Sequence, residues 1–529
     1  MSQSAVHPVL VAGEWRPATP TGTFTATNPK TRQPLTDTFP VSGPADLEAA
    51  LVAATTAAAE LRALPNAGES LAAFLDAYAT GIEANADAIV ASAQTETGLP
   101  EKPRLRDVEL PRTTGQLRQA AAAARAGDWQ RPIVDTKINL RSCLAPIGPV
   151  LAIGPNNFPY AYNGIAGGDF AAALAAGNPV IAKSHPLHPN TSRLFAEIAK
   201  KALDAGGLPA ATVQMIYHVS NADGLRLVAD PRLKAVGFTG SRRGGLALKA
   251  SADAAGTLFF GEMSSLNPTV LLPGAIAANA DAIADQYVTS LLAGAGQFCT
   301  KPGLLLVIAG PATDAWLKTV CQKTAAAPVG TLFSAGGQQA VCDAIDTLKN
   351  AGAELVVGGT PNAAGGFGIA NTLLRVTARQ FLADAHAFQT EAFGNAGLVI
   401  VSDDIEQLTT VVHALEGQLT GSIYSAAGVD DSAYAKVAAA LRPRVGRLIN
   451  DKMPTGVAVA AAMNHGGPFP ATSQPHFTAV GMPTAIARFT QLESYDAVRE
   501  QRLPPCLRDK NPTGKLWRQI DGNWTQGDV

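Results

Sequence analysis

One cysteine stands in a setting that could make it a nucleophile. Cys299 follows a Gly-Ala-Gly run at 294–296 and precedes Lys301 and a Pro-Gly pair at 302–303. Small residues let a ligand approach the backbone, and Pro-Gly ends a helix or a turn. A neighbouring lysine favours the thiolate, which is the nucleophilic form of cysteine. Because an isolated cysteine is more often a small buried hydrophobic residue, the assignment depends on the rest of the chain.

Two further polar residues stand where they could assist a thiolate. Glu262 lies in the otherwise apolar stretch 260–268, where burial would raise its pKa and make it a better general base near neutral pH. Asn157 follows the apolar strand pattern of 150–154, and an amide at a strand end can donate to a developing oxyanion. The plainer alternatives are a Glu paired with a basic neighbour and an Asn that caps a turn.

Several residues at strand ends suit a dinucleotide. The stretch 238–245, with Thr-Gly-Ser and Gly-Gly, links an apolar strand to a helix, where backbone amides suit a pyrophosphate. It is not a Gly-x-Gly-x-x-Gly motif, so an ordinary glycine-rich turn is the alternative. Lys183 ends another strand and could bind ribose hydroxyls or a phosphate, or be solvated. Glu391 and Phe393, in a loop before a strand, could bind a ribose and pack beside a ring, or form a turn.

Composition narrows the class of protein. A chain of 529 residues is too long for one hydrophobic core, so we expect two or three domains. With 47% hydrophobic and 16% charged residues, 50 Gly and 36 Pro, it has the composition of a compact, loop-rich enzyme. The net charge of −2 gives no indication of nucleic-acid or anionic-membrane binding.

The cysteines and the termini indicate the compartment. The five cysteines are odd in number, lie far apart and show no Cys-x-x-Cys spacing, so we expect neither a disulfide framework nor a metal site. The N-terminus shows no secretion signal, and no apolar run reaches the 18 residues of a membrane span. We therefore expect a cytoplasmic protein.

The period of the apolar pattern changes along the chain. Residues 44–97 and 111–127 are helical in pattern, whereas 129–147 are more extended. From 150 to 238, four apolar strand patterns alternate with helices, which predicts a doubly wound parallel sheet that binds ligands beyond the carboxyl ends of its strands. A second alternation from 269 to 450 predicts a second α/β domain.

The order of these motifs resembles the aldehyde dehydrogenase superfamily. Each motif alone is weak, but the ordered set is specific and covers nearly the whole chain, from about Ala12 to about Pro505. The set comprises Asn-Phe-Pro at 157–159, Lys183, Phe-Thr-Gly-Ser at 238–241, Glu262, Gly-Gln-Phe-Cys at 296–299 and Glu-Ala-Phe-Gly at 391–394.

Further stretches resemble α-ketoglutarate semialdehyde (2,5-dioxopentanoate) dehydrogenases and a related NADP-dependent fatty aldehyde dehydrogenase. The resemblance implies oxidation of an aldehyde to an acid, with 2,5-dioxopentanoate to 2-oxoglutarate as the first expectation. Medium or long aliphatic aldehydes are the alternative, and a cofactor-independent thiol esterase is a rival from another class. The intact Cys299, Glu262 and Asn157 argue against a non-catalytic scaffold. These stretches are 112–118, 166–169, 262–268, 454–457 and 465–473.

The resemblance implies an α/β fold with two doubly wound domains and a small β arm for oligomerisation. We therefore expect a homodimer or homotetramer in which 129–147 pairs with a strand near 478–495 of a partner. The expected parts are a cofactor-binding domain (1–128 and 148–262), a catalytic domain (263–477), an oligomerisation arm (129–147 and 478–505) and a C-terminal tail (506–529).

The resemblance also implies roles for individual residues. Cys299 would attack the aldehyde carbon, Asn157 and the Cys299 amide would stabilise the oxyanion, and Glu262 would activate the water that hydrolyses the thioester. The expected NAD or NADP site comprises Lys183, Ser184, His185, Gly240, Ser241, Gly245, Glu391 and Phe393. The expected substrate residues are Arg112, Gln116, Phe158, Tyr162, Phe298 and Phe469.

Departures from the common family pattern refine these expectations. Ser264-Ser265 replaces the usual Gly-Gly after the catalytic carboxylate, which would shift cofactor contacts, and Ile165-Ala166 replaces a lysine that relays protons in many members. Pro186 stands where NAD-specific members carry a Glu that repels a 2′-phosphate, so we favour NADP, with Ser184 and His185 near its phosphate.

The substrate carboxylate needs a cation or several donors. Arg112 and Gln116 lie one helical turn apart on one face, and the equivalent helix lines the substrate entrance in the family. A surface or interdomain salt bridge is the alternative role for Arg112.

Overall fold

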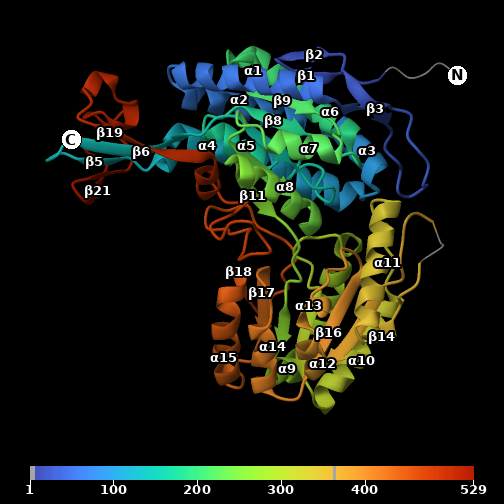
Figure 1. Cartoon of the computed structure of the whole chain (residues 1–529). Helices are drawn as coiled ribbons and strands as arrows, with labels where there is room; N and C mark the ends of the chain where they lie inside the picture. Colours follow the sequence, from blue (N-terminus) through green and yellow to red (C-terminus); the bar gives the residue numbers. More distant parts are fainter. Residues whose placement is uncertain (1–5, 362–364) are drawn as a thin grey trace.

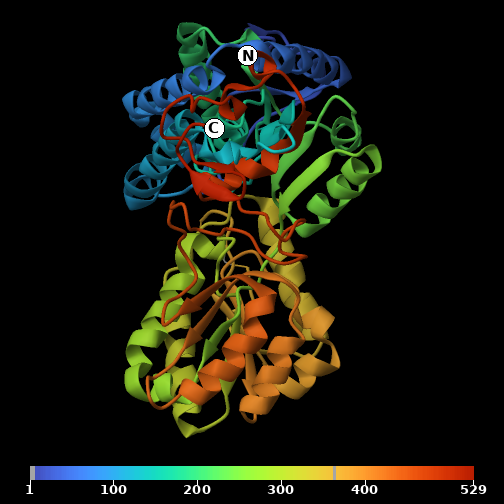
Figure 2. The same cartoon turned by 90° about the vertical axis from the view of Figure 1, so that its left-hand side faces the viewer.

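Residues 6–361 and 365–529 are described by the computed structural model, in which three larger sheets organise the chain. Two sheets of seven strands form the upper and lower bodies in Figure 1, and a five-stranded sheet projects from the upper body as an arm. Turned by 90°, the molecule shows the same two bodies, joined by irregular segments of the chain (Figure 2).

The first sheet has the order β11-β10-β7-β8-β9-β1-β2. Its core strands run parallel, so their carboxyl ends share one edge. The chain winds outward from β7 in both directions, which places the topological switch point between β7 and β10. The bounds are β1 (Val9–Val11), β2 (Glu14–Arg16), β7 (Val150–Ile153), β8 (Val180–Lys183), β9 (Val213–Ile216), β10 (Ala235–Thr239) and β11 (Leu258–Glu262). A separate two-stranded sheet joins β3 (Pro20–Phe24) and β4 (Phe39–Ser42).

The Ala-rich region 44–97 forms three helices rather than one. The chain turns at Asn66, whose φ of 58° is left-handed, and again at Asn85. Asn tolerates such conformations better than most residues because its short side chain bonds locally. The helices of this body are α1 (Pro44–Ala63), α2 (Ala67–Ala84), α3 (Ala86–Thr97), η1 (Glu101–Glu109), α4 (Leu110–Ala126), α5 (Gly168–Ala175), α6 (Pro189–Gly206), α7 (Asn221–Val228) and α8 (Arg242–Ala255).

The second sheet has the order β14-β15-β16-β13-β12-β17-β18 and confirms the second α/β alternation. Alternate residues of β13 enter two separate cores: Leu304 and Leu306 pack on one face, Leu305 and Val307 on the other. Burial on both faces explains why the strand is a continuous apolar run. The strands are β12 (Thr269–Leu271), β13 (Leu304–Ile308), β14 (Glu354–Val357), β15 (Thr372–Thr377), β16 (Ala396–Ser402), β17 (Gln418–Tyr424) and β18 (Val445–Asn450).

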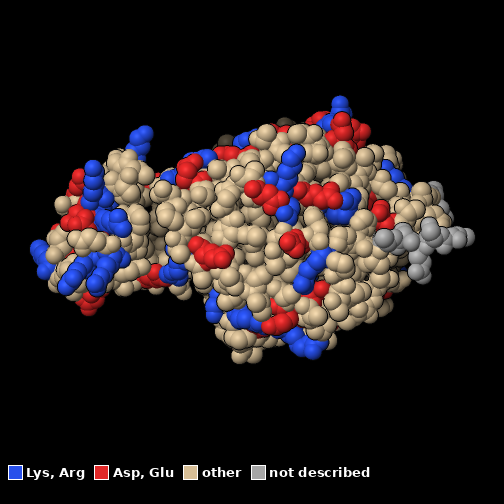
Figure 3. Space-filling model, turned by 90° about the horizontal axis from the view of Figure 1, so that it is seen from above, with Lys and Arg blue, Asp and Glu red and all other residues tan. Residues whose placement is uncertain are grey.

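Helices cover both faces of the second sheet. They are α9 (Pro273–Leu292), α10 (Pro311–Ala326), α11 (Ala335–Asn350), α12 (Ala378–Ala383), α13 (Ala385–Phe388), α14 (Ile405–His413) and α15 (Asp431–Leu441). No helix in the described part of the chain is long and apolar enough to cross a bilayer. Basic and acidic side chains are interspersed over the face seen in Figure 3, consistent with the net charge of −2.

The arm differs from the expectation in two ways. Strand β6 (Leu140–Pro146) pairs with β19 (Thr490–Asp496) of the same chain, not with that segment of a partner. The tail is not a separate segment either: β20 (Arg518–Ile520) pairs with β5 (Ile133–Asp135) and with β21 (Asn523–Thr525). A returning chain offers strand pairing without the loss of freedom that a second molecule would bring.

Arg518 anchors the tail within the arm. The residue is fully buried, and its guanidinium donates to the carbonyls of Arg508, Asp509 and Gly527 at 2.5, 3.0 and 2.7 Å. One side chain therefore joins the two halves of the tail.

Replacing this guanidinium should loosen the tail. Arg518→Met removes the donor to three partly buried carbonyls, and each lost hydrogen bond costs about 1 kcal/mol. We expect hydrogen exchange at β20 and β21 to accelerate by about tenfold or more, measured by mass spectrometry. Lys515→Met, at an exposed position of the same tail, is the control. Unchanged exchange in Arg518→Met would show that the arginine does not hold the tail.

Candidate active site

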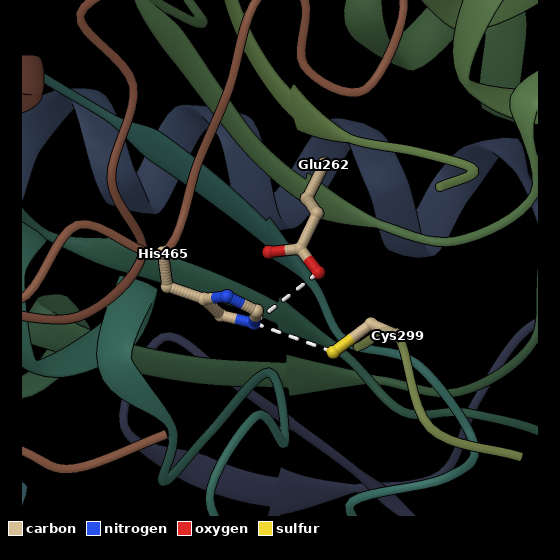
Figure 4. Close-up of side chains that lie close together, drawn as sticks. All are labelled: Glu262, Cys299 and His465. Atoms are coloured by element: carbon tan, nitrogen blue, oxygen red, sulfur yellow. Dashed lines mark hydrogen bonds and ion pairs between the residues drawn. The ribbon is translucent and has the colours of Figure 1, made fainter. Parts of the chain in front are cut away.

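Three side chains meet where the two sheets face each other. Glu262 ends β11, Cys299 lies between helix η4 (Ala293–Gly296) and β13, and His465 lies on the segment that returns after β18. His465 Nε2 is 3.3 Å from Cys299 Sγ and 3.4 Å from Glu262 Oε1 (Figure 4). The predicted pair Cys299 and Glu262 is thus brought together. The sequence analysis missed His465 as a site residue, although it begins the distinctive stretch 465–473.

The loop that carries Cys299 depends on glycine. Gly296 has a φ of 70°, and a Cβ there would lie 2.1 Å from the Gly394 carbonyl oxygen. Only glycine allows this approach to the loop that contains Glu391. Asn267 anchors the other side, since its amide donates to the carbonyls of Cys299 and Lys301 at 2.8 and 2.9 Å. The cysteine backbone is therefore fastened from two directions.

Burial controls the protonation of the three groups. It raises the pKa of Glu262 to about 8 and lowers the pKa of His465 to about 3. Burial, reinforced by the Glu262 charge, also raises the pKa of the Cys299 thiol well above its usual range, while Arg112 opposes the shift. At pH 7 the free enzyme therefore holds a thiol and a neutral imidazole.

The expected influence of Lys301 on the thiol is wrong. Its ammonium donates to the carbonyls of Ala392, Gly394 and Ala396 at 2.5, 3.0 and 2.8 Å. The lysine thus joins the cysteine loop to the loop 391–396 instead of stabilising a thiolate. The Lys301 ammonium is bound to backbone oxygens, and the pKa of the Cys299 thiol is raised rather than lowered.

A buried ion pair fixes the loop that carries Asn157. Glu109 accepts from the backbone amides of Tyr160 and Ala161 at 2.9 and 3.1 Å and pairs with Arg104. Arg104 also donates to the Asn157 carbonyl at 3.0 Å and lies 4.4 Å from the Phe158 ring centre. The Asn157 amide donates to the Gln297 carbonyl at 2.9 Å, two residues before the cysteine. No motif in the sequence indicated Arg104 or Glu109.

Three of the predicted aromatic residues form one cluster. Phe158 meets Tyr162 and Phe298 edge-on, with ring centres 5.4 and 5.3 Å apart, and Tyr162 lies 5.7 Å from the His465 ring. Phe469 does not join this cluster: its side chain is 58% exposed, at the surface. The other rings therefore form a continuous cluster from Phe298, next to the cysteine in the chain, to His465.

Arg112 and Gln116 share a helix face but not a role. Gln116 is buried, and its amide donates to the Ala161 carbonyl at 2.9 Å, so it supports the loop rather than lining an entrance. Arg112 donates to Val457 O and Tyr162 Oη at 2.9 and 3.0 Å. Both partners are uncharged, so these contacts do not form the surface or interdomain salt bridge that was the alternative role for Arg112.

A second arginine, which the sequence analysis missed, approaches from the other sheet. Arg447 of β18 donates to the Pro454 carbonyl at 2.9 Å, and Arg112 binds the same segment at Val457. Both arginines lower the pKa of His465, after the larger effect of burial. Among the described residues, the Nε atoms of Arg112 and Arg447 are buried without a hydrogen-bond partner. Arg447 lies inside a strand pattern, and no motif in the sequence indicated that it is a site residue.

Lys183, Ser184 and His185, which we expect to hold part of a dinucleotide, lie at the carboxyl end of β8 in the first sheet. Lys183 ends β8 and donates to one carbonyl, that of Ser184, at 3.2 Å, and burial lowers its pKa to about 8. A half-buried ammonium with three donors and one such bond has capacity for ribose hydroxyls or phosphate oxygens. Ser184 is buried beside it, and the His185 ring stacks on His188 at 5.3 Å.

The turn after β10 begins a helix, as predicted. Ser241 caps α8 by accepting from the Gly244 amide at 3.3 Å, and the Gly240 amide donates to the Glu262 carbonyl at 3.1 Å. A Cβ at Gly245 would lie 2.9 Å from Met263 atoms, so glycine lets α8 pack closely beside β11. The first turn of a helix at this edge fits an anionic group.

Glu391 is already engaged within the protein. Its carboxylate accepts from the Ser264 hydroxyl and the Ser265 amide, and burial raises its pKa. The Ser-Ser pair that departs from the family pattern thus bonds to a residue expected to hold a ribose. Phe393, two residues on, is half-buried in the same loop.

Two doubly wound sheets, with Cys299, Glu262 and His465 close together between them, define an α/β enzyme of the dinucleotide-binding class. The aldehyde dehydrogenase family model matches residues 15–468, and the chain belongs to that family. The predicted family is thereby confirmed, and the protein is an NAD(P)-dependent aldehyde oxidoreductase.

Individual relatives extend the likeness over nearly the whole chain. Alpha-ketoglutaric semialdehyde dehydrogenase 2 of Azospirillum brasilense is 40% identical over 508 residues, 93% of this chain and 94% of the relative. Alpha-ketoglutaric semialdehyde dehydrogenase of Acinetobacter baylyi is 36% identical and covers 86% and 87%. Lactaldehyde dehydrogenase from Escherichia coli superposes with a TM-score of 0.80 at 22% identity, covering 92% of this chain and 98% of that one, which confirms the fold.

Loss of Arg104 should misplace Asn157. Arg104→Met removes the donor to the Asn157 carbonyl and leaves the buried Glu109 without its counter-ion. Because small displacements of positioned groups can cost about 100-fold, we expect kcat to fall by roughly 10- to 100-fold with a smaller change in KM. Steady-state kinetics measures both. Arg106→Met is the control, since Arg106 pairs with the surface carboxylates of Asp87 and Glu101. Equal effects of the two substitutions would contradict a specific role for Arg104.

Proposed function

We propose that the protein oxidises 2,5-dioxopentanoate to 2-oxoglutarate through a thioester on Cys299. The observation that carries the substrate assignment is that Arg112 of helix α4 and Arg447 of strand β18 both bind the segment 454–457. The Thr455 hydroxyl of this segment donates to the Thr300 carbonyl, next to the cysteine, at 3.3 Å. A semialdehyde with a carboxylate at its far end requires such donors, whereas an aliphatic aldehyde does not. The names of the two relatives from Azospirillum and Acinetobacter support the same substrate.

The reaction begins with the thiol. As Cys299 Sγ bonds to the aldehyde carbon, its proton passes to Glu262, whose pKa of about 8 makes it the better acceptor. His465, with a pKa of about 3, stays neutral and positions the thiol and the carboxylate through its Nε2. This assignment follows from the pKa values, because an imidazole so weakly basic holds a proton poorly.

The oxyanion and the thioester need different residues. The Asn157 amide and the Cys299 backbone amide stabilise the oxyanion, and loss of one such donor typically costs about 3 kcal/mol. When bound, the nicotinamide cofactor accepts a hydride from the substrate carbon. Glu262 releases to solvent the proton that it took from Cys299. It then removes a proton from the water that attacks the thioester and passes that proton to Cys299, which leaves as a thiol.

We propose that the first sheet and its helices, residues 1–128 and 148–262, bind NADP in preference to NAD, and that 263–477 supply the cysteine. Lys183 would bind ribose or phosphate oxygens, with Ser184 and His185 near the 2′-phosphate, and Gly240, Ser241 and Gly245 would receive the pyrophosphate at α8. Glu391 would share its Ser264 contact with a ribose hydroxyl, while Phe393 would pack beside a ring. Support comes from Pro186, which places no negative charge beside Ser184.

We also propose assembly into a homodimer or homotetramer through the arm. The pairing within the chain leaves β19 and β21 as the outer strands of the arm sheet. Leu492 on β19 is 68% exposed and Trp524 on β21 is 58% exposed. Outer strands with exposed apolar side chains are suited to contacts between subunits.

The substrate proposal is tested by removing each guanidinium. We expect the wild-type enzyme to form NADPH faster than NADH, and to act on 2,5-dioxopentanoate in preference to hexanal. Arg112→Ala and Arg447→Ala should each lower kcat/KM for the dioxo acid by roughly 10- to 100-fold, the value of a charge-assisted hydrogen bond, but for hexanal by much less. The measurement is the initial rate by absorbance.

Matched controls separate the alternatives. Arg118→Ala, on the same helix as Arg112, removes a surface ion pair with Glu83 and should leave kcat/KM unchanged for both aldehydes. If kcat/KM fell equally for both aldehydes in the Arg112 and Arg447 variants, these arginines would not be the carboxylate-binding residues. Ester hydrolysis at full rate without cofactor would instead support a thiol esterase.

The pH dependence reports on Glu262. A base must be deprotonated, so activity should rise with pH, about tenfold per unit at low pH, and level off above pH 8, where burial has moved the carboxyl pKa. Glu262→Gln should abolish this rise of activity with pH and lower kcat by about 100-fold or more. Rates measured from pH 5.5 to 9.5 check both. A wild-type profile that is flat below pH 7 would contradict the assignment.

A further inference from the structure

The cysteine, carboxylate and imidazole at the site also form the ligand set of a metal ion. One ligand atom from each of Glu262, Cys299 and His465 lies within 4.8 Å of the other two. Figure 4 shows the three side chains pointing toward one common point from different segments of the chain. Sequence spacing predicted no metal site, because these residues are far apart and only the fold joins them.

Two of the three separations between the ligand atoms match tetrahedral coordination, and the third, from Cys299 Sγ to Glu262, is within 4.8 Å. Zinc bonds of about 2.3 Å to sulfur and 2.0–2.2 Å to nitrogen or oxygen place tetrahedral S and N ligands about 3.6 Å apart, and N and O ligands about 3.4 Å apart. The observed Sγ–Nε2 distance is 3.3 Å and the Nε2–Oε1 distance is 3.4 Å. An ion therefore needs shifts of only a few tenths of an ångström along these two edges.

The carboxylate is free to coordinate. Glu262 is 1% exposed, and among the described residues its carboxylate contacts the Cys299 thiol and His465 Nε2, which are the other two ligands. A buried carboxylate with only these contacts gains more from a cation than one already solvated or ion-paired. His465 is equally buried, whereas Cys299 is half-buried, which leaves a coordination position open beside the sulfur.

We propose that Glu262, Cys299 and His465 bind one Zn²⁺ ion, and that this ion reversibly inhibits the enzyme. One thiolate, one imidazole and one carboxylate suit zinc better than calcium or magnesium, which prefer oxygen ligands. On binding at neutral pH, the Cys299 Sγ–H bond and the Glu262 carboxyl O–H bond break, both protons pass to solvent, and zinc bonds form to Sγ, to the carboxylate oxygen and to His465 Nε2, with no change of oxidation state. Arg112 and Arg447 limit the affinity, since both are cations close to the site.

Inhibition follows from the same geometry. The ion takes the sulfur lone pair that attacks the aldehyde and the carboxylate that activates water, so one ligand removes two functions. This consequence rests on the proposed role of Cys299, whereas binding itself does not. The protein thus carries a site by which a free transition-metal ion controls aldehyde oxidation.

Cobalt tests the site without substrate or cofactor. Co²⁺ added to the full-length protein should give a sulfur-to-cobalt charge-transfer band and tetrahedral visible bands that saturate at one ion per chain. Cys299→Ser should abolish the charge-transfer band, and His465→Gln or Glu262→Gln should raise the Kd by about tenfold or more. Zn²⁺ should displace the cobalt. Cys321→Ser/Cys342→Ser, which removes the two half-buried cysteines elsewhere, is the control and should bind like the wild type.

Kinetics supplies the second readout. Zn²⁺ should inhibit the wild type at concentrations that match its displacement of cobalt, a chelator should restore the rate, and Zn²⁺ should slow alkylation of Cys299. Absence of a saturable cobalt spectrum, or a spectrum unchanged by His465→Gln, would overturn the proposal. Cobalt binding as expected in a protein inactive on every aldehyde would leave the site standing and refute the proposed reaction instead.

Discussion

The desolvation of Glu262 is the constraint on which the site depends. A carboxylate sealed between two sheets holds its proton to a pH near 8, and the same burial keeps the neighbouring thiol protonated. The charge of Glu262 reinforces the effect on the thiol once the carboxyl has lost its proton. Burial also leaves the reaction dependent on a proton transfer that must accompany the first bond to the substrate.

Charged side chains around the site hold these groups in place by hydrogen bonding to backbone atoms. Lys301 holds three carbonyls, and Glu109 holds two amides with the help of Arg104. Such bonds lock loops without adding net charge beside the thiol. The arginines closer to the cysteine behave differently, because each keeps a buried nitrogen without a partner and so retains capacity for a ligand.

Two sheets contribute in different ways. The first presents strand ends, and with them Asn157, Lys183 and Glu262, which is the general behaviour of a doubly wound sheet at its switch point. The second sheet contributes the loop before β13, which carries the cysteine, and the irregular segment after β18, which carries His465. Neither residue lies directly at the carboxyl end of a strand. The active centre exists only where the two bodies face each other.

The sequence by itself determined the family, the two α/β alternations and the pair Cys299 and Glu262. These are local properties: apolar periodicity, glycines that a turn requires, and short motifs in a fixed order. Only the tertiary structure decided the neighbours. Arg447, Arg104 and Glu109 carry no local signal, and the distinctive stretch 465–473 did not single out His465. Gln116 turned inward and Phe469 outward, and the arm paired within its chain. Which distant groups share a buried volume depends on packing, and the pKa of each group depends on those neighbours.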